Sequence, residues 1–352
     1  MAQEELLQKL FKKKNFTPNE NQYKAIINTE GPLMLTAGPG SGKTHVLLWR
    51  TLYLIVEKKV NPDEIFLATF TKKASQQLID GLQELLNYAT EITNERYDIS
   101  QMYVGTLHSL CERLLKDRRF VSSREDGSGD NDTIVLDELS QYFFVSNSKV
   151  WKELLRQAGY DVEGVEDLSP IYKEINSAFD NYFSSKSECI ENCISFFNRM
   201  AEENFSDEQL FIKYKLKSEE NYNEEEIKQE GIYKEFAERQ KKKQEVKTDV
   251  TKKLFLMTKI YRQLLKNGKV EKVDFAILQQ KALELILSKK ENSKVFKYVI
   301  VDEYQDTNTI QQEIYFALIK EYKNICVVGD DDQALYRFRG ATVENLVGFE
   351  DI

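Results

Sequence analysis

The chain has 352 residues, enough for two domains of ordinary size. Hydrophobic residues make up 41% and charged residues 30%, as in water-soluble globular proteins. The formal net charge of −9 argues against a protein that binds nucleic acid through bulk attraction, although a local basic groove remains possible. No apolar run is long enough to cross a bilayer and no secretory signal begins the chain, so we expect a cytoplasmic protein with no membrane contact.

A parallel sheet is predicted from five short apolar segments that each lead into a polar turn and then a helical pattern. Thr17 and Pro18 predict a capped helix start before the first of them, and Thr71 and Thr106 are placed to cap the helices after the second and third. Uninterrupted apolar strands that alternate with helices indicate an α/β fold with helices on both faces of the sheet. The predicted strands are residues 32–37, 64–69, 101–105, 297–302 and 324–329.

The chain between the third and fourth predicted strands has a different character. Residues 122–132 form a polar loop rich in Gly, Ser and Asp, and residues 137–266 are mostly helical in pattern and heavily charged. We therefore predict a mostly α-helical subdomain, 116–269, inserted into an α/β domain formed by 1–115 and 270–352. Cys189 and Cys193 lie four residues apart in this insertion, but no local Cys/His set completes a zinc site, and reduced thiols are the expected state.

The strongest motif is a glycine-rich loop between the first predicted strand and the next helix. Its glycines allow backbone N–H groups to converge on phosphate oxygens at a helix N-terminus. Lys43 would contact the β- and γ-phosphates, and the Thr44 hydroxyl would bind Mg²⁺. The alternative is a glycine-rich turn that binds nothing, which the strand–loop–helix context disfavours. The predicted ATP-binding residues of this loop, a Walker A or P-loop sequence, are Ala37, Gly38, Gly40, Ser41, Gly42, Lys43 and Thr44.

Carboxylates follow the fourth predicted strand and a glutamine follows the fifth. Asp302 would hold the magnesium ion, and Glu303 would orient and deprotonate the attacking water. Gln333 lies among aspartates after the last strand and could hydrogen-bond the γ-phosphate or the water. Ligands of parallel sheets bind at the carboxyl ends of the strands, where these side chains would meet the P-loop. An Asp-rich turn is the alternative for the segment of Gln333.

Together these motifs resemble the UvrD/Rep-type DNA helicases of superfamily 1. Seven segments occur in the order of that family: FTPNENQYKAI, AGPGSGKT, LATFTKKAS, YVGTLHSL, VDFAIL, VIVDEYQDTNTIQQ and VVGDDDQALYRFRGA. They cover residues 16–110 and 272–345. The resemblance implies a P-loop (RecA-like) domain with a helical insertion, ATP and Mg²⁺ as ligands, and an enzyme of DNA metabolism, including DNA repair.

The resemblance also implies roles for single residues. Gln22 matches the glutamine that reads adenine, and Lys43, Thr44, Asp302, Glu303 and Gln333 match the ATP, magnesium, base and phosphate-sensing positions. Positions that contact single-stranded DNA match Phe70, His108, Tyr336, Phe338 and Arg339. Lys72 replaces a usual asparagine and would add a phosphate contact. A core position is the alternative for Phe70. His45 stands where the family usually has arginine, and Phe338 where it has tryptophan.

From these matches we expect an ATP-dependent 3′–5′ DNA helicase or translocase that acts on single-stranded DNA and its junction with duplex. The motifs of the second RecA-like domain of that family do not appear before Ile352. We therefore expect a fragment that works with C-terminal helicase domains of a longer chain and is weak or inactive alone. Two other interpretations stay open, an ATP-gated nucleic-acid-binding module without motor activity and an RNA helicase of the same superfamily.

Overall fold

The computed structural model describes residues 2–38, 40–121, 133–204, 232–268, 270–288 and 290–330. The chain divides into two compact units. The first comprises Met1–Ser128 and Leu278–Ile352, and the second Gly129–Ile277. Both divisions lie further along the chain than the predicted limits at 115/116 and 269/270.

A five-stranded sheet forms the centre of the first unit. Its strands are β1 (Leu33–Thr36), β2 (Ile65–Thr69), β3 (Tyr103–Thr106), β6 (Tyr298–Val301) and β7 (Ile325–Gly329). They run in the order β1-β7-β6-β2-β3, and every neighbouring pair is parallel. The five predicted strands and the α/β fold class are therefore confirmed. Because all five strands are parallel, their carboxyl ends meet at one edge, named the carboxyl edge below.

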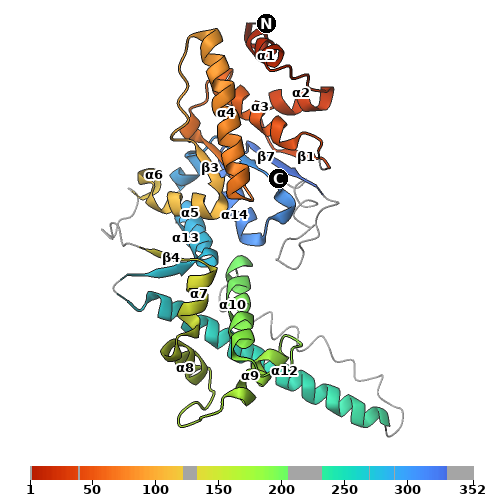
Figure 1. Ribbon diagram of the computed structural model, residues 1–352, viewed down its shortest axis with the longest axis vertical. Helices are drawn as coiled ribbons and strands as arrows, with labels where there is room; N and C mark the ends of the chain where they lie inside the picture. Colours follow the sequence, from red (N-terminus) through yellow and green to blue (C-terminus); the bar gives the residue numbers. More distant parts are fainter. Residues whose placement is uncertain are drawn as a thin grey trace. The chain divides into compact units, whose positions relative to one another are not determined.

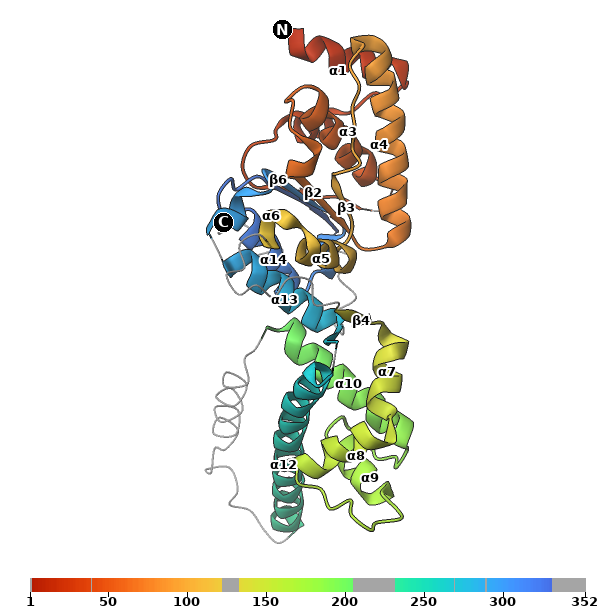
Figure 2. The ribbon, with the colours of Figure 1, turned by 90° about the vertical axis from the view of Figure 1, so that its left-hand side faces the viewer.

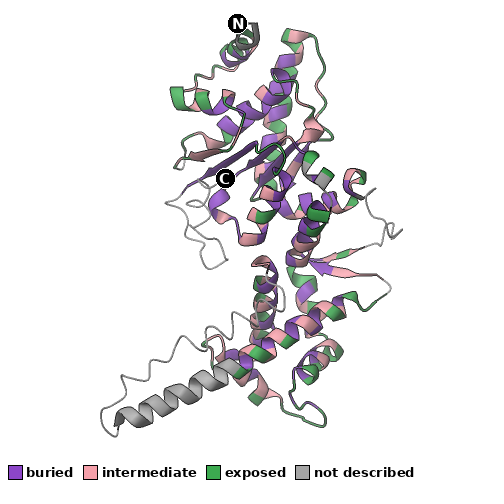
Figure 3. Cartoon of the chain, turned by 180° about the vertical axis from the view of Figure 1, so that it is seen from behind, coloured by how far each residue is buried: buried purple, intermediate pink, exposed green. Residues whose placement is uncertain are grey.

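Helices cover both faces of this sheet, as Figures 1 and 2 show. One face carries α1 (Ala2–Lys13), α2 (Glu20–Ile27), α3 (Lys43–Val56) and α4 (Lys72–Thr93). The other carries α5 (Leu107–Lys116), α6 (Arg118–Val121), α13 (Phe275–Ser288), which begins in the second unit, and α14 (Thr309–Leu318). The short 3₁₀ turns are η1 (Pro62–Glu64), η3 (Lys290–Lys294) and η4 (Tyr304–Asp306). The three inner strands, β7, β6 and β2, are buried on both faces (Figure 3), which explains their uninterrupted apolar sequences.

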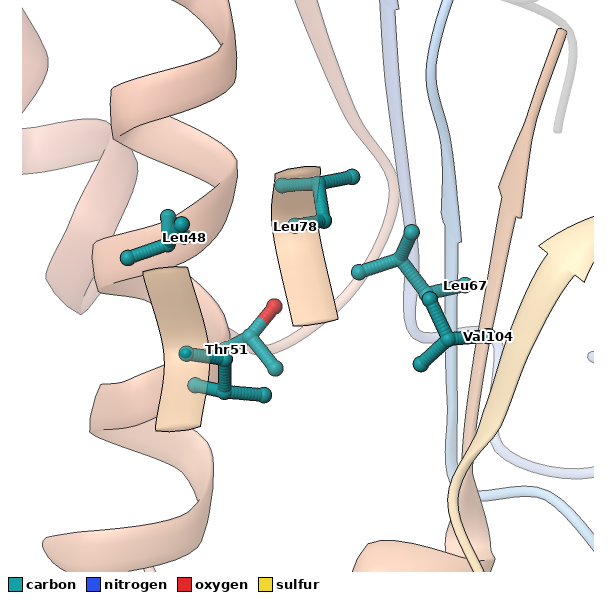
Figure 4. Close-up of a pocket in the computed structure, with 6 residues that line it drawn as sticks. Leu48, Thr51, Leu67, Leu78 and Val104 are labelled. Carbon is teal, nitrogen blue, oxygen red and sulfur yellow. The ribbon is translucent and has the colours of Figure 1, made fainter. Parts of the chain in front are cut away.

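The core between α3, α4 and the sheet contains a small apolar void (Figure 4). Leu48 and Thr51 of α3 and Leu78 of α4 face Leu67 and Val104 of the strands across it. The only polar atom drawn there, the Thr51 hydroxyl, donates to the backbone of its own helix, to Leu47 O at 2.8 Å. A void with no unpaired polar group stays dry and is a packing feature of the core.

Helix caps agree with the sequence at two positions and differ at a third. Thr71 accepts a hydrogen bond from Ala74 N, and Thr106 accepts one from Ser109 N, so both predicted caps are confirmed. The predicted cap at Thr17 is wrong, because α2 begins at Glu20 with Asn19 as its N-cap. Asn19 and Gln22 bond to each other's backbone N–H groups, and this reciprocal pair outcompetes the single hydroxyl of Thr17.

The second unit is mostly helical. Its helices are α7 (Glu138–Ser146), α8 (Ser148–Gln157), α9 (Ser169–Ser177), α10 (Lys186–Glu202) and α12 (Ile232–Lys266). At its base the strand β4 (Ile134–Leu136) pairs in parallel with β5 (Lys272–Asp274), a contact between residues more than a hundred positions apart that the sequence analysis did not predict. Cys189 and Cys193 are buried free thiols. No group of acidic, histidine and cysteine side chains suited to a metal occurs in the described ranges.

The division after α6 has a packing reason. Arg119 of α6 donates to Asp63 O at 2.9 Å, and Phe120 is buried with its ring 6.2 Å from that of Phe296, which precedes β6. These contacts attach α6 to the sheet, so the first unit continues past the predicted limit. Across the described parts of the chain, none of the helices combines the length and the apolar character needed to span a bilayer.

Candidate nucleotide site and nucleic-acid face

The glycine-rich loop leaves β1 at the carboxyl edge and ends where α3 begins at Lys43. Ala37 N donates to Gly329 O at 3.1 Å, which attaches the start of the loop to the end of β7. Gly40 and Gly42 have φ values of 73° and 87°, a left-handed backbone that favours glycine. The loop leads into the N-terminus of α3, whose first N–H groups have no partner within the helix and could hold an anion.

Gln22 connects α2 to this loop. Its side-chain Oε1 accepts from Asn19 N at 3.0 Å, and its Nε2 donates to Ser41 O at 3.1 Å. A Cβ atom at Gly42 would lie 3.2 Å from Gln22 Nε2, so the glycine also makes room for this contact. The structure therefore places the predicted adenine-reading residue directly against the predicted phosphate loop.

The lysine of the loop and the carboxylates after β6 meet at one place. Lys43 Nζ lies 3.9 Å from Glu303 Oε2. Asp302 is 8% exposed and its backbone N–H donates to Ala68 O of β2 at 2.9 Å. Two segments separated by some 260 residues of sequence thus form one charged cluster between β1, β7 and β6.

Burial leaves Asp302 short of compensating positive charge. Desolvation, and then the neighbouring Glu303 carboxylate, raise its pKa to about 6, while Lys43 lowers it only in part. Such a carboxylate gains from a cation. Mg²⁺ is usually held by one or two protein oxygens together with substrate phosphates. The Asp302 carboxylate and the hydroxyl of Thr44, the second residue of α3, would supply a donor set of that kind. The residues present fit a magnesium–triphosphate complex.

Glu303 adopts an unusual backbone conformation, with φ 54° and ψ 46°. Non-glycine residues pay a steric cost in this left-handed region and occupy it where their surroundings hold them. Here Glu303 N donates to Asp302 Oδ1 at 3.1 Å, Asp306 N donates to Glu303 O at 3.0 Å, and Gln305 Nε2 donates to Glu303 Oε2 at 2.6 Å. The carboxylate is held in one orientation beside Lys43.

Phe70 follows β2 at the same carboxyl edge and is 50% exposed. The alternative that it packs in the core is therefore wrong. The residues around it are fixed: the Thr69 and Ser75 hydroxyls lie 2.5 Å apart, and Thr71 caps α4. Lys72, the first residue of α4, is also exposed. An aromatic ring and an ammonium group, two positions apart in the chain, are thus both exposed to solvent at this turn.

His108 lies in the first turn of α5, after β3, and is partly buried. Burial lowers its pKa, so at neutral pH the imidazole is uncharged and suits hydrogen bonding better than ion pairing. The turn before it is tightly packed, because a Cβ atom at Gly105 would lie 2.6 Å from Ser109 Oγ. Thr69 and Thr106 are register partners in β2 and β3, so Phe70 and His108 follow adjacent strand ends.

The order of strands therefore divides the carboxyl edge into two parts. The ends of β1, β7 and β6 carry the candidate nucleotide residues, and the ends of β2 and β3 carry the candidate nucleic-acid residues. Asp302 N bonded to Ala68 O joins the parts, two residues before Phe70. The other predicted site residues, Gln333, Tyr336, Phe338 and Arg339, lie outside the described residues.

Residues 18–351 match the family model of the UvrD/REP helicase N-terminal domain. The chain belongs to this family. It is 30% identical over 334 residues to the ATP-dependent DNA helicase PcrA of Bacillus subtilis, with 94% of the chain and 35% of that protein covered. It is 28% identical to the proteins of the same name in Staphylococcus aureus and Staphylococcus epidermidis, over 94% and 95% of the chain and 36% of each relative. The chain thus spans about a third of the length of these curated relatives.

Two residues of this UvrD/REP-family domain matter more than the sequence analysis recognised. Arg50 is buried in α3 and donates to Ala25 O at 2.5 Å and to Asn28 O at 2.6 Å, so it closes the end of α2. Its signal was available, since it is a lone charge in the apolar run of α3. Gln305 was noted only as part of its motif, and no sequence pattern shows that its amide reaches both Glu303 and the end of β7.

Proposed function

We propose that this chain is the ATP-binding half of an ATP-dependent DNA helicase or translocase that moves 3′ to 5′ along single-stranded DNA. The observation that carries the proposal is the cluster of Lys43, Asp302 and Glu303 at the carboxyl edge, with Lys43 Nζ 3.9 Å from Glu303 Oε2. The family and the name of the relatives, ATP-dependent DNA helicase, support it.

In the proposed reaction Lys43 and the first N–H groups of α3 bind the β- and γ-phosphates. Thr44 and Asp302 would hold Mg²⁺, which would neutralise phosphate charge. Glu303 orients a water molecule in line with the γ-phosphorus and takes its proton as the oxygen–phosphorus bond forms. The bond to the bridging oxygen breaks, and ADP and phosphate leave.

The proposed track for DNA is the part of the edge formed by β2 and β3. Phe70 stacks on a base, Lys72 contacts a phosphate, and neutral His108 forms a hydrogen bond. Stacking on an aromatic ring tolerates any base, which suits movement along an arbitrary sequence. Asp302 is hydrogen-bonded to Ala68 of β2, two residues before Phe70. A displacement of Asp302 when the phosphates change can therefore reach Phe70, and the DNA bound there, through one hydrogen bond and two residues of backbone.

The test uses two proteins. In this chain, a fluorescent ATP analogue with Mg²⁺ should bind, and Lys43→Ala should abolish binding while the circular dichroism spectrum is unchanged. In the complete natural protein, single-stranded DNA should stimulate ATP hydrolysis more than single-stranded RNA does. Glu303→Gln should reduce turnover to a small residual rate while nucleotide binding is retained. Unwinding of a 3′-tailed duplex in preference to a 5′-tailed one tests the direction. Absence of DNA-stimulated hydrolysis in the complete protein would refute the proposal.

A further inference from the structure

The side chain of Gln305 bridges two functional segments of the carboxyl edge. It is 4% exposed and lies in η4, two residues after Glu303. Its Nε2 donates to Glu303 Oε2 at 2.6 Å, and its Oε1 accepts from Asp330 N at 3.1 Å. Asp330 follows the last residue of β7, so the bridge runs from the end of β6 to the end of β7.

The chemistry of the two partners specifies an amide. A carboxylate requires a donor, and a backbone N–H requires an acceptor, and glutamine offers one of each at opposite corners of the same planar group. These partners also decide which corner is nitrogen, because the reversed amide would place oxygen against oxygen at Glu303. Glutamate at this position could accept from Asp330 N but would repel Glu303, and methionine could do neither.

Glu303 needs such a holder. Its backbone is in the left-handed region, and its side chain is 36% exposed. The nearby Lys43 ammonium, at 3.9 Å, is beyond hydrogen-bond distance and is the group that the proposed function assigns to the phosphates. Once Lys43 turns to a nucleotide, the short bond from Gln305 still fixes the carboxylate.

We propose that Gln305 is a positioning residue that aims the Glu303 carboxylate at the attacking water and ties that aim to the end of β7. This inference rests on the proposed function. The buried amide would then do more than stabilise the fold. Displacement of the β7 end would move Asp330 N, Gln305 would move with it, and the Glu303 carboxylate would lose its alignment with the water. Hydrolysis is then sensitive to the position of the β7 end.

The experiment measures steady-state and single-turnover ATP hydrolysis with single-stranded DNA in the complete natural protein. Gln305→Met and Gln305→Glu should each lower kcat about 10- to 100-fold, the effect of a misplacement of about 1 Å. KM for ATP and the affinity for a fluorescent ATP analogue should stay within about threefold, because ground-state contacts to nucleotide do not involve Gln305. Gln311→Glu is the matched control, since Gln311 caps α14 through Asn308 N and a glutamate preserves that cap.

A double-mutant cycle decides whether Gln305 acts through Glu303. In a Glu303→Gln background, Gln305→Met should lower the residual single-turnover rate by less than about twofold, because the group that it positions is already gone. A further 10-fold loss there, or kcat within about twofold of wild type in both single variants, overturns the inference while leaving the proposed function intact. A wild-type protein without hydrolysis refutes the proposed function, and the inference falls with it. Equal losses of kcat and nucleotide affinity with an unfolding midpoint shifted in both variants would make Gln305 merely structural.

Discussion

The buried arginine of α3 offers a quantitative test of how the nucleotide edge is supported. Arg50 is 2% exposed and donates to Ala25 O and Asn28 O, two carbonyl groups at the end of α2 that have no partner further along that helix. Because α2 carries Gln22, Arg50 fixes the helix that contacts the P-loop. We predict that Arg50→Met, which keeps most of the side-chain volume, destabilises the first unit.

The magnitude follows from the two bonds. Hydrogen bonds to a charged group contribute about 1.5–3 kcal/mol each, so the pair contributes about 3–6 kcal/mol. The Arg50 Nε has no hydrogen-bond partner among the described residues, so the buried charge carries a desolvation cost. Its removal recovers that cost and offsets part of the lost free energy. We expect a net loss of about 3 kcal/mol in the free energy of unfolding. With a urea m-value of about 2 kcal/mol/M, the midpoint should fall by about 1.5 M.

The assay uses the two tryptophans of the chain, Trp49 and Trp151. Trp49 is buried in the first unit and Trp151 in the second, so fluorescence of Trp49 in a Trp151→Phe background follows the first unit alone. Arg118→Met, a change at an exposed arginine of α6, is the control and should change the free energy of unfolding by less than about 0.5 kcal/mol. A loss below about 1 kcal/mol for Arg50→Met would refute the view that this side chain supports α2.

Three further predictions concern the edge itself. Phe70→Ala should weaken binding of single-stranded DNA by about 5- to 150-fold in a fluorescence-anisotropy titration, the equivalent of 1–3 kcal/mol, whereas Tyr322→Ala, before β7 at the opposite edge, should have no effect. Gly42→Ala should weaken ATP binding about 10-fold in calorimetry, because its left-handed φ strains alanine by about 1–2 kcal/mol and the new Cβ crowds Gln22. The pKa of Asp302, raised to about 6, means that the folded protein holds this proton more tightly than the unfolded chain does. Without metal, the first unit should therefore lose stability as pH rises from about 4 to about 6. Mg²⁺–ATP affinity should increase over the same range, since magnesium binds the carboxylate. Asp302→Asn should remove both trends, and their persistence would contradict the assignment.

Local sequence determined the elements of the first unit because its signals are local. An apolar run flanked by turn residues forms a buried strand wherever it pairs, and all five predicted strands are present. Glycines at Gly40 and Gly42 supply a backbone that other residues adopt with strain, so the phosphate loop was visible without knowledge of its neighbours. The helix start at Asn19 was missed because a reciprocal cap competes with a plausible single one two residues away, and only their relative energies decide.

Only the tertiary structure decided which of these local pieces meet. The order β1-β7-β6-β2-β3 places Asp302 against Ala68 and brings Lys43 to Glu303, and no pattern within either segment contains that information. Exposure of Phe70, burial of Arg50 and the two-ended bond of Gln305 were likewise undetermined by sequence, because each depends on atoms contributed by residues distant in the chain. Residue types set what chemistry is possible at each position, and long-range packing sets the distances over which that chemistry acts.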